Sequence, residues 1–277
     1  MKRSMPTVLA FLAISATALP TKAGSARSAS PITLTAIANS GVLVAAGGSK
    51  VLIDGLFDKP DPAYRAPSAD VIDKMMKGAA PFDGVDLVLV THNHSDHLDP
   101  ALAVRYLEAR PEVSLLAPAD AVSEMRKLSA DWTKIEPRVA ALDLKVGEKA
   151  ERTVKGIPVT AFRTLHGGSA TPMNLMYLFE IGGRRIFHEG DSSALSEEWR
   201  GFGLGGAPID LAVVHFWFPF ERVRARMLLE DLKPAHVALV HLLVEDEGTY
   251  PEMVDKARPS YRDLILMLPG VPPKILD

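Results

Sequence analysis

A dense histidine cluster behind an apolar run constrains this chain more than any other feature. The segment "THNHSDHLDP" follows the apolar residues 87–90 and holds three of the eight histidines in 277 residues. Asp99 and Pro100 then give a helix start, with Asp as the N-cap and Pro at the first helical position. The cluster is therefore expected in a turn between a buried strand and a helix.

The residue types in this turn suit a metal site. His92, His94, Asp96 and His97 form the pattern H-x-H-x-D-H. Imidazole is the commonest metal ligand, and a metal site needs several such groups on a short, bent segment. Because neighbouring side chains alternate in direction, we expect His92 and His94 to converge on one ion while Asp96 and His97 reach a second. The alternative is a solvated loop that binds metal adventitiously.

Three further candidate ligands follow apolar, strand-like runs. His166 follows "IPVTAFRTL", Asp191 follows "RRIFHEG" and His241 follows "HVALV". The C-terminal ends of strands are where α/β proteins place their sites. Read one by one, each of these residues could be a packed or capping residue. Together with the histidine cluster they are better explained by one shared site.

Strand and helix patterns alternate along the chain. Residues 32–57 and 173–191 each read as strands joined by a Gly-Gly turn. Helical spacing is found near residues 71–77 and over 100–110, 119–132 and 221–232, and helix is also expected within 250–268. We therefore expect a mixed α/β fold, and residues 24–277 have a length that suits one domain.

The first 23 residues have the layout of a secretory signal peptide. Lys2 and Arg3 precede an apolar stretch from Val8 to Leu19, and a cleavage point after Ala23 fits the small residues there. The apolar stretch is shorter than the roughly 20 apolar residues that span a bilayer. We therefore expect an exported protein, periplasmic or secreted, with no transmembrane segment in the mature chain. A membrane-anchoring helix is the alternative.

Cysteine content and charge narrow the partners. The chain has no cysteine, which removes thiolate metal ligands and a lipoprotein anchor, and a core of this size needs no disulfides. Without residues 1–23 the formal net charge moves from −3 to −6, because Lys2, Arg3 and Lys22 are lost. A mildly acidic chain with no basic run argues against nucleic acid as a partner. A small-molecule or lipid-like substrate is expected, and the oligomeric state stays open.

Four segments carry a resemblance to a known family. They are "VTHNHSDHLDP", "HGG" from His166, "GDSS" from Gly190 and "KPAHVALVH" ending in His241. With them the chain resembles the metallo-β-lactamase-fold metallohydrolase superfamily over residues 32–241, and especially its branch of ascorbate-phosphate lactonases and N-acyl-phosphatidylethanolamine phospholipase D-like proteins. The resemblance implies an αββα sandwich of four layers with a dinuclear metal site at one edge.

The same resemblance implies a division of the ligands. The first metal would take His92, His94 and His166, the second Asp96, His97 and His241, and Asp191 would bridge the two. True β-lactamases of the main subclass use a cysteine on the second metal, which this chain lacks. Flavodiiron-type members typically carry a carboxylate where His94 stands. The chain departs from both of these branches.

A site with two metal ions predicts hydrolysis as the reaction. Two divalent ions about 3.5 to 4 Å apart would hold a bridging hydroxide at neutral pH, which suits ester, lactone, amide and phosphodiester bonds. Asp96 is the candidate catalytic residue, as a proton relay beside the bridge. Zn²⁺ is the favoured metal, and Fe, Mn or Co fit the same ligands. The leading hypothesis is an exported hydrolase. The alternatives are a non-catalytic metal-binding protein of the same fold and a di-iron redox protein.

The remaining histidines are assigned from strand alternation. His236 lies five residues before His241 and His188 three before Asp191, so each should face away from the site. His215 is a candidate substrate contact, and it begins the apolar segment "HFWFPF" (residues 215–220), which suits either a substrate pocket or a core strand. Asp54 and Asp58 are candidates to hydrogen-bond the metal-binding histidines.

Overall fold

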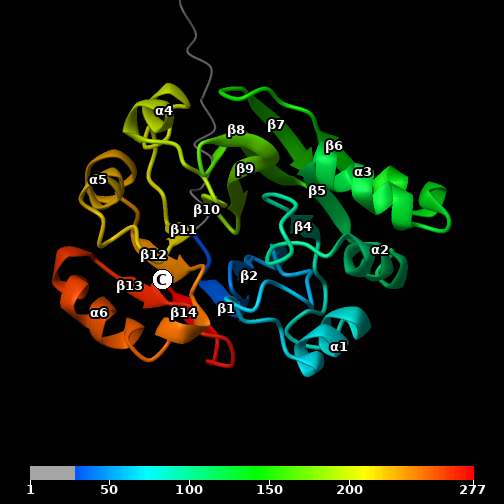
Figure 1. Ribbon diagram of the computed structural model, residues 1–277, viewed down its shortest axis with the longest axis horizontal. Helices are drawn as coiled ribbons and strands as arrows, with labels where there is room; N and C mark the ends of the chain where they lie inside the picture. The colour runs from blue at the N-terminus through cyan, green and yellow to red at the C-terminus, as the bar shows by residue number, and fades with distance from the viewer. Residues whose placement is uncertain (1–28) are drawn as a thin grey trace, which may run out of the picture.

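The computed structural model describes residues 29–277, so the expected signal peptide lies outside the described residues. In the described range, no helix is both long enough and apolar enough to cross a membrane. Figure 1 shows strands gathered in the middle of the molecule and helices on the outside.

Two seven-stranded sheets form the centre of the described chain. The first runs in the order β14 (Lys274–Leu276), β1 (Ile32–Ala38), β2 (Gly41–Ala46), β3 (Ser49–Ile53), β4 (Leu87–Leu89), β5 (Ser114–Pro118), β6 (Val139–Leu142). The second runs in the order β13 (Leu264–Leu266), β12 (His236–Val240), β11 (Leu211–His215), β10 (Arg184–His188), β9 (Ser169–Ile181), β8 (Ile157–His166), β7 (Lys149–Val154).

Each sheet combines antiparallel and parallel pairing. In the first sheet the strands from β3 to β6 are parallel neighbours, and in the second sheet those from β10 to β13 are parallel. The remaining pairs are all antiparallel. Each joins strands that are consecutive in the chain, except the pair of β1 with β14. Parallel strands end at a common edge of their sheet, and this edge carries the site described below.

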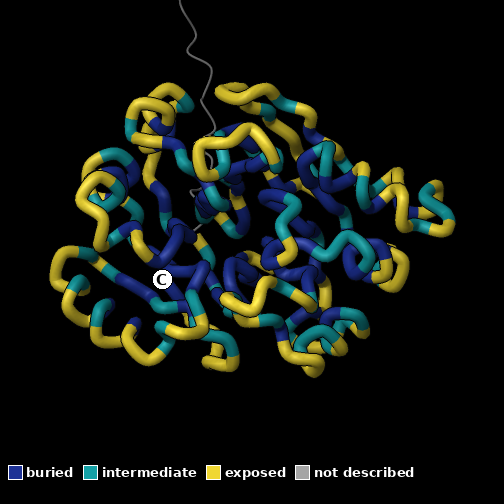
Figure 2. The backbone as a smooth tube through the Cα atoms, in the orientation of Figure 1, coloured by how far each residue is buried: buried dark blue, intermediate teal, exposed yellow. Residues whose placement is uncertain are grey.

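The inner faces of the two sheets pack on each other. Leu34, Val44 and Leu89 from the first sheet share one apolar cluster with Tyr177 and Val213 from the second. All five side chains are completely buried. Strand alternation makes this possible, because β-branched and other apolar residues recur at every second position and so occupy one face. Figure 2 shows many dark-blue, buried segments in the middle of the molecule and yellow, exposed segments on the outer helices and on loops.

Helices cover the outer face of each sheet. The first sheet is covered by α1 (Ala69–Lys77), α2 (Pro100–Ala109) and α3 (Ala119–Leu128), and the second by α4 (Ser196–Gly201), α5 (Arg222–Arg226), the π-helical η3 (Met227–Leu232) and α6 (Tyr250–Ala257). Short 3₁₀ turns are η1 (Trp132–Lys134), η2 (Glu136–Arg138), η4 (Val244–Asp246) and η5 (Arg258–Ser260). The four layers confirm the predicted αββα sandwich.

Local signals account for several boundaries. Asp99 Oδ1 accepts the backbone N–H groups of Ala101 (2.8 Å) and Leu102 (3.1 Å), so α2 begins where the sequence predicts. The helix predicted over 119–132 is shorter, because α3 ends at Leu128 and a 3₁₀ turn follows. The expected helix in 250–268 is α6, which gives way to a strand, β13.

The segment at residues 215–220 is not a core strand, so that interpretation is wrong. Only His215 belongs to β11, and the chain turns immediately after it. Phe216 packs on Tyr250 of α6 and Phe218 lies under Arg224 of α5, whereas Trp217 and Phe220 are exposed. Pro219 has no N–H to extend a strand ladder, which favours the turn.

Candidate metal centre

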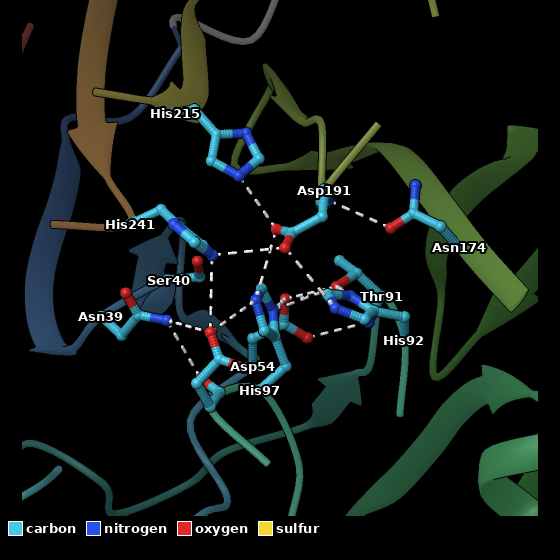
Figure 3. Close-up of polar contacts among 12 residues, drawn as sticks. Asn39, Ser40, Asp54, Thr91, His92, His97, Asn174, Asp191, His215 and His241 are labelled. Atoms are coloured by element: carbon cyan, nitrogen blue, oxygen red, sulfur yellow. Dashed lines mark hydrogen bonds and ion pairs between the residues drawn. The ribbon is translucent and has the colours of Figure 1, made fainter. Parts of the chain in front are cut away.

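Strand ends from both sheets converge on one point of the sandwich edge. The turn at residues 91–97 follows β4 of the first sheet, and His166 ends β8 of the second sheet. Asp191 and His241 follow β10 and β12. Figure 3 shows Asp191 and His241 directed toward His92 and His97 across the gap between the sheets. The structure therefore brings together all seven residues expected as ligands.

The first group of donors consists of His92, His94, His166 and Asp191, with ligand atoms within 4.8 Å of one another. Asp191 Oδ2 lies 3.3 Å from His166 Nε2 and 3.6 Å from His92 Nε2. Tetrahedral ligands with bonds of about 2.0–2.1 Å are about 3.3 Å apart. The spacing therefore matches what a coordinated ion requires.

The second group consists of Asp96, His97 and His241, again within 4.8 Å of one another. Asp96 Oδ2 lies 3.5 Å from His97 Nε2 and 3.4 Å from His241 Nε2. Asp191 approaches this group too, with its Oδ1 3.3 Å from His97 Nε2 and its Oδ2 3.2 Å from His241 Nε2. Asp191 thus contacts both groups, as a bridging ligand must.

Several buried polar atoms in this centre lack a hydrogen-bond partner within residues 29–277. They include His92 Nε2, His97 Nε2 and Asp191 Oδ1. A buried polar group left unpaired costs about 1–3 kcal/mol. These three atoms belong to the two groups just described, so one metal ion in each group would satisfy them. The residues present fit a metal centre.

A buried carboxylate supports the second group from behind. Asp54 Oδ2 lies 2.8 Å from His97 Nδ1, and the same side chain accepts the backbone N–H of Thr91 (2.8 Å) and its hydroxyl (2.6 Å). A carboxylate on the far nitrogen fixes a ligating imidazole's tautomer and orientation. Asp58 was expected in the same role, but its Oδ1 is buried without a hydrogen-bond partner in the described chain.

Two asparagines that the sequence analysis did not single out position the carboxylates. Asn39 Nδ2 donates to Asp96 Oδ2 at 2.8 Å. Asn174 Oδ1 accepts the backbone N–H of Asp191 at 3.0 Å, and its amide donates to Thr164 Oγ1 at 2.9 Å. Both asparagines are buried. A lone asparagine has no distinctive spacing, so only the fold reveals these roles.

Glycine is required where the chain enters the Asp191 loop. Gly190 has φ +58°, and a Cβ there would lie 2.8 Å from Asn174 Oδ1 and 2.9 Å from Thr91 Cβ. Any larger residue would be strained by the left-handed backbone and would clash with these atoms, so glycine is favoured here. The glycine of "GDSS" thus serves the packing that holds Asp191.

His215 lies in the centre but outside the seven expected ligands. Its Nε2 is 3.1 Å from Asp191 Oδ1, and its Nδ1 is 2.5 Å from Glu189 Oε1. Glu189 is fully buried and also accepts the backbone N–H of His215 at 2.7 Å. His215 and His241 form a third group with Asp191 that could hold a metal. The sequence analysis missed Glu189, although a carboxylate directly after a strand was a signal.

The electrostatics of the centre follow from burial and paired charges. Burial lowers the pKa of His92 well below its usual value. For His97, burial also disfavours the charge, but Asp191 and Asp54 outweigh it and raise the pKa well above the usual value. Burial would raise the pKa of Asp191, yet the surrounding histidines hold it well below the usual range. Asp191 is therefore ionised and ready to bind a cation.

Two histidines lie outside the ligand groups, as strand alternation predicts. His188 Nδ1 accepts the backbone N–H of Gly190 at 3.1 Å, and burial lowers the pKa of His188 to about 4. His236 Nδ1 lies 2.8 Å from Asp263 Oδ2. Neutral His188 therefore supports the loop that carries Asp191. His236 instead pairs with Asp263, away from the ligand groups.

Comparisons with known proteins agree with this geometry. The sequence profile of the family described as "Beta-lactamase superfamily domain" matches residues 49–249. A "UPF0173 metal-dependent hydrolase" of Thermococcus onnurineus is 27% identical over 197 residues, which cover 67% of this chain and 80% of that protein.

Two solved structures share the fold at low identity. The metallo-beta-lactamase fold protein YhfI from Bacillus subtilis superposes with a TM-score of 0.60 at 15% identity, covering 89% of this chain and 99% of that one. CmlA, a diiron beta-hydroxylase from Streptomyces venezuelae, gives a TM-score of 0.57 at 13% identity, covering 89% of this chain and 54% of that one. The profile match spans most of the sequence, so the chain belongs to the beta-lactamase superfamily and has the metallo-β-lactamase fold.

Proposed function

We propose that this protein is a hydrolase that depends on two divalent metal ions, with Zn²⁺ as the favoured metal. The observation that carries the proposal is the position of Asp191, whose two oxygens contact histidines of both ligand groups. A similar protein from Thermococcus onnurineus is named a metal-dependent hydrolase, which supports the reaction class.

The two groups would hold one ion each. His92, His94 and His166 would take the first, and Asp96, His97 and His241 the second, with Asp191 between them. When bound, two such ions supply a hydroxide nucleophile at neutral pH and polarise the bond under attack. Nitrogen and oxygen ligands of this kind also accept Fe, Mn or Co.

The carboxylates leave the centre positively charged. Asp96 and Asp191 together carry two negative charges, which do not neutralise two divalent ions. The remaining positive charge favours an anionic substrate or the oxyanion that develops during attack on an acyl or phosphoryl group. Ester, lactone, amide and phosphodiester bonds all meet this requirement.

Asp96 is the residue we propose for proton transfer. Asn39 fixes its Oδ2 at 2.8 Å, and the same oxygen lies within 3.5 Å of both His97 and His241. Histidines around it hold the pKa of Asp96 below its usual value although burial opposes this. An ionised carboxylate held at one place can accept a proton during attack and return it to the leaving group.

The first experiment combines metal content with turnover. Residues 24–277 are loaded with zinc and given chromogenic phosphodiesters, lactones, esters and a cephalosporin, with Asp96→Ala alongside. We expect two zinc ions per chain in the wild type and turnover of one bond class, reduced at least 100-fold in Asp96→Ala. A variant that binds both ions and turns over at the wild-type rate would remove the role proposed for Asp96.

A histidine pair on one strand provides the matched control. His236 begins β12 and His241 directly follows its end, so each variant removes one imidazole at one end of the same strand. His241→Ala should retain about one ion, whereas His236→Ala should retain two. Equal metal content in the two variants would contradict the assignment of His241.

The same experiment separates two other functions. Two bound ions with no turnover across the panel would favour a non-catalytic metal-binding role. Iron retained after anaerobic purification, with an optical spectrum that changes on oxidation and no hydrolysis, would favour a di-iron redox protein. Turnover distinguishes the hydrolase from both alternatives, and the identity of the bound metal distinguishes the two alternatives from each other.

We further propose that the protein is exported. The support is the basic, apolar and small-residue order of residues 1–23. Expression of the full chain should give a mature protein that begins near residue 24 outside the cytoplasm. A cytoplasmic protein that still carries residues 1–23 would refute export and leave the hydrolase proposal untouched.

A further inference from the structure

An exposed tryptophan stands directly beside the candidate metal centre. Trp217 is 42% exposed, and its ring stacks on His215 with centroids 4.1 Å apart at 22°. It also meets His241 edge-on, with centroids 5.7 Å apart at 78°. His215 therefore covers one face of the Trp217 ring, while the residue as a whole stays exposed.

The turn after β11 holds Trp217 in this position. Its neighbours Phe216 and Phe218 are 8% and 0% exposed and enter the core, so they anchor the turn on both sides. The Phe218 N–H donates to His215 O at 3.1 Å, and Trp217 O accepts the N–H groups of Phe220 and Glu221 at 2.9 and 3.0 Å. The exposure of Trp217 therefore comes from a hydrogen-bonded turn.

A second aromatic ring flanks the same histidine. Tyr64 contacts His241 edge-on, with ring centroids 4.6 Å apart at 68°. The side chain of Tyr64 is only partly buried. Tyr64 and Trp217 both lie against His241, and both come from loops outside the strands that carry the ligands.

Long-range contacts fix the Tyr64 loop. Tyr64 pairs with Leu243 in an isolated antiparallel bridge, and the next residue, Arg65, is bound through two hydrogen bonds to Glu247, at 2.7 Å (Nε to Oε1) and 2.5 Å (Nη2 to Oε2). The Val244 N–H donates to Ala63 O at 2.9 Å. The ring of Tyr64 is thus placed by contacts on either side of it.

We propose that Tyr64 and Trp217 form an aromatic mouth that binds an aryl group attached next to the bond that the centre cleaves. This inference rests on the proposed hydrolase function and specifies its substrate class. Aromatic rings gain free energy from stacked or edge-to-face contact beyond the gain from buried area. An exposed aromatic residue beside a cationic centre therefore suits a substrate that joins a planar apolar group to an anionic or oxyanion-forming group.

The test measures binding and needs no turnover. Zinc-loaded protein is titrated calorimetrically with phenylphosphonate and with methylphosphonate, which share the anionic group and differ in the aryl ring. We expect the wild type to bind phenylphosphonate about three- to tenfold more tightly, the range that one aromatic contact provides. The preference should fall to about one in the double variant Tyr64→Ala with Trp217→Ala.

Matched variants show whether the ring itself matters. Trp217→Phe keeps an aromatic ring and should keep part of the preference. Phe220→Ala removes another exposed aromatic of the same turn, whose ring packs on Phe216 at 4.9 Å, and should keep all of it. Zinc content and thermal unfolding of each variant check that the fold is intact.

The outcomes separate this inference from the proposed function. Equal affinity for the two phosphonates in the wild type, absence of binding, or a preference that survives the double variant would overturn the aromatic mouth. A normal preference without hydrolysis of any ester, lactone, amide or phosphodiester that carries an aryl group would leave the mouth standing and refute the hydrolase. Hydrolysis without the preference for phenylphosphonate would support the hydrolase and refute the aromatic mouth.

Discussion

Asp54 Oδ2 lies 2.8 Å from His97 Nδ1 where neither side chain is exposed to solvent. The carboxylate comes from the end of β3, and the imidazole comes from the turn after β4, which is the parallel neighbour of β3. Asp54 itself has φ 46°, a left-handed backbone that bends it toward the centre. A buried pair that costs desolvation thus includes a candidate ligand, His97.

Asp54→Asn should weaken metal binding without removing a ligand. An amide cannot hold the imidazole with a full negative charge, and loss of such a partner typically reduces metal affinity about 10–100-fold. Competition with a chromogenic chelator measures this change. Asp58→Asn is the matched control and should bind metal normally, and equal affinities for the two variants would show that Asp54 does not act through His97.

Metal removal should lower stability. Ligands that bind only the folded chain add about 2.7 kcal/mol when present at 100 times their dissociation constant. Removing both ions also leaves His92 Nε2, His97 Nε2 and Asp191 Oδ1 unpaired. Thermal unfolding with a chelator should therefore occur at a lower temperature than with zinc, and the difference should grow with zinc concentration. Identical unfolding curves would argue against a site formed by the folded chain.

His188 should make the stability of the metal-free protein fall in mild acid. Its folded pKa of about 4 lies below the ordinary value of 6.5, because burial disfavours the charged form. Between these values the unfolded chain binds the proton and the folded chain does not, so stability present above pH 6.5 is lost as the pH falls toward 4. The contribution is about 3 kcal/mol at most.

Urea unfolding at several pH values measures that contribution. The difference between wild type and His188→Gln should change across pH 4–6.5 and stay constant above pH 7, since glutamine does not titrate. A difference that does not vary with pH would show that His188 is not buried in its neutral form.

Gly190→Ala should destabilise the protein more than Gly156→Ala does. Both Gly190 (φ +58°) and Gly156 (φ +79°) have left-handed backbones, but a Cβ at Gly156 meets no atom within 4 Å. Backbone strain of about 1–3 kcal/mol applies to both sites. Only Gly190→Ala also displaces Asn174 and Thr91. Urea unfolding should rank it as the less stable variant, and zinc content should fall in Gly190→Ala alone.

Glu189→Gln should change the titration of His215. Burial lowers the pKa of His215, but Asp191 and Glu189 outweigh it and raise the pKa to about 9 in the absence of metal. Removing the charge of Glu189 removes part of this stabilisation, so the pKa should fall toward 6.5. Histidine NMR spectra of the metal-free protein measure it. An unchanged titration would mean that the 2.5 Å contact carries no charge interaction.

The fold and the ligand groups were predictable because their signals are local. His92 to His97 occupy six consecutive residues, and His166, Asp191 and His241 each follow a recognisable apolar run. Tyr64 was not predictable, because its loop has no periodicity and its position depends on Arg65 and Glu247, which are 182 residues apart.

The apolar turn after β11 shows a second limit. Phe216, Trp217 and Phe218 are equally apolar in the sequence, yet only the middle one is exposed. Hydrophobic content alone does not distinguish a residue that packs under α5 from one that faces the centre. The direction of each side chain is set by turn hydrogen bonds, which the sequence pattern does not encode.

Because strands of both sheets converge on Asp191, the proposed ions would also cross-link distant parts of the chain. Residues 92–97 and His241 lie far apart in sequence, and a shared centre joins them as a disulfide would, in a protein that has no cysteine. His97 and His241 are 144 residues apart, and a cross-link that closes a loop of about 100 residues or more removes several kcal/mol of chain entropy from the unfolded state. Such a cross-link is reversible, so the rigidity of the sandwich would follow the supply of free metal around it.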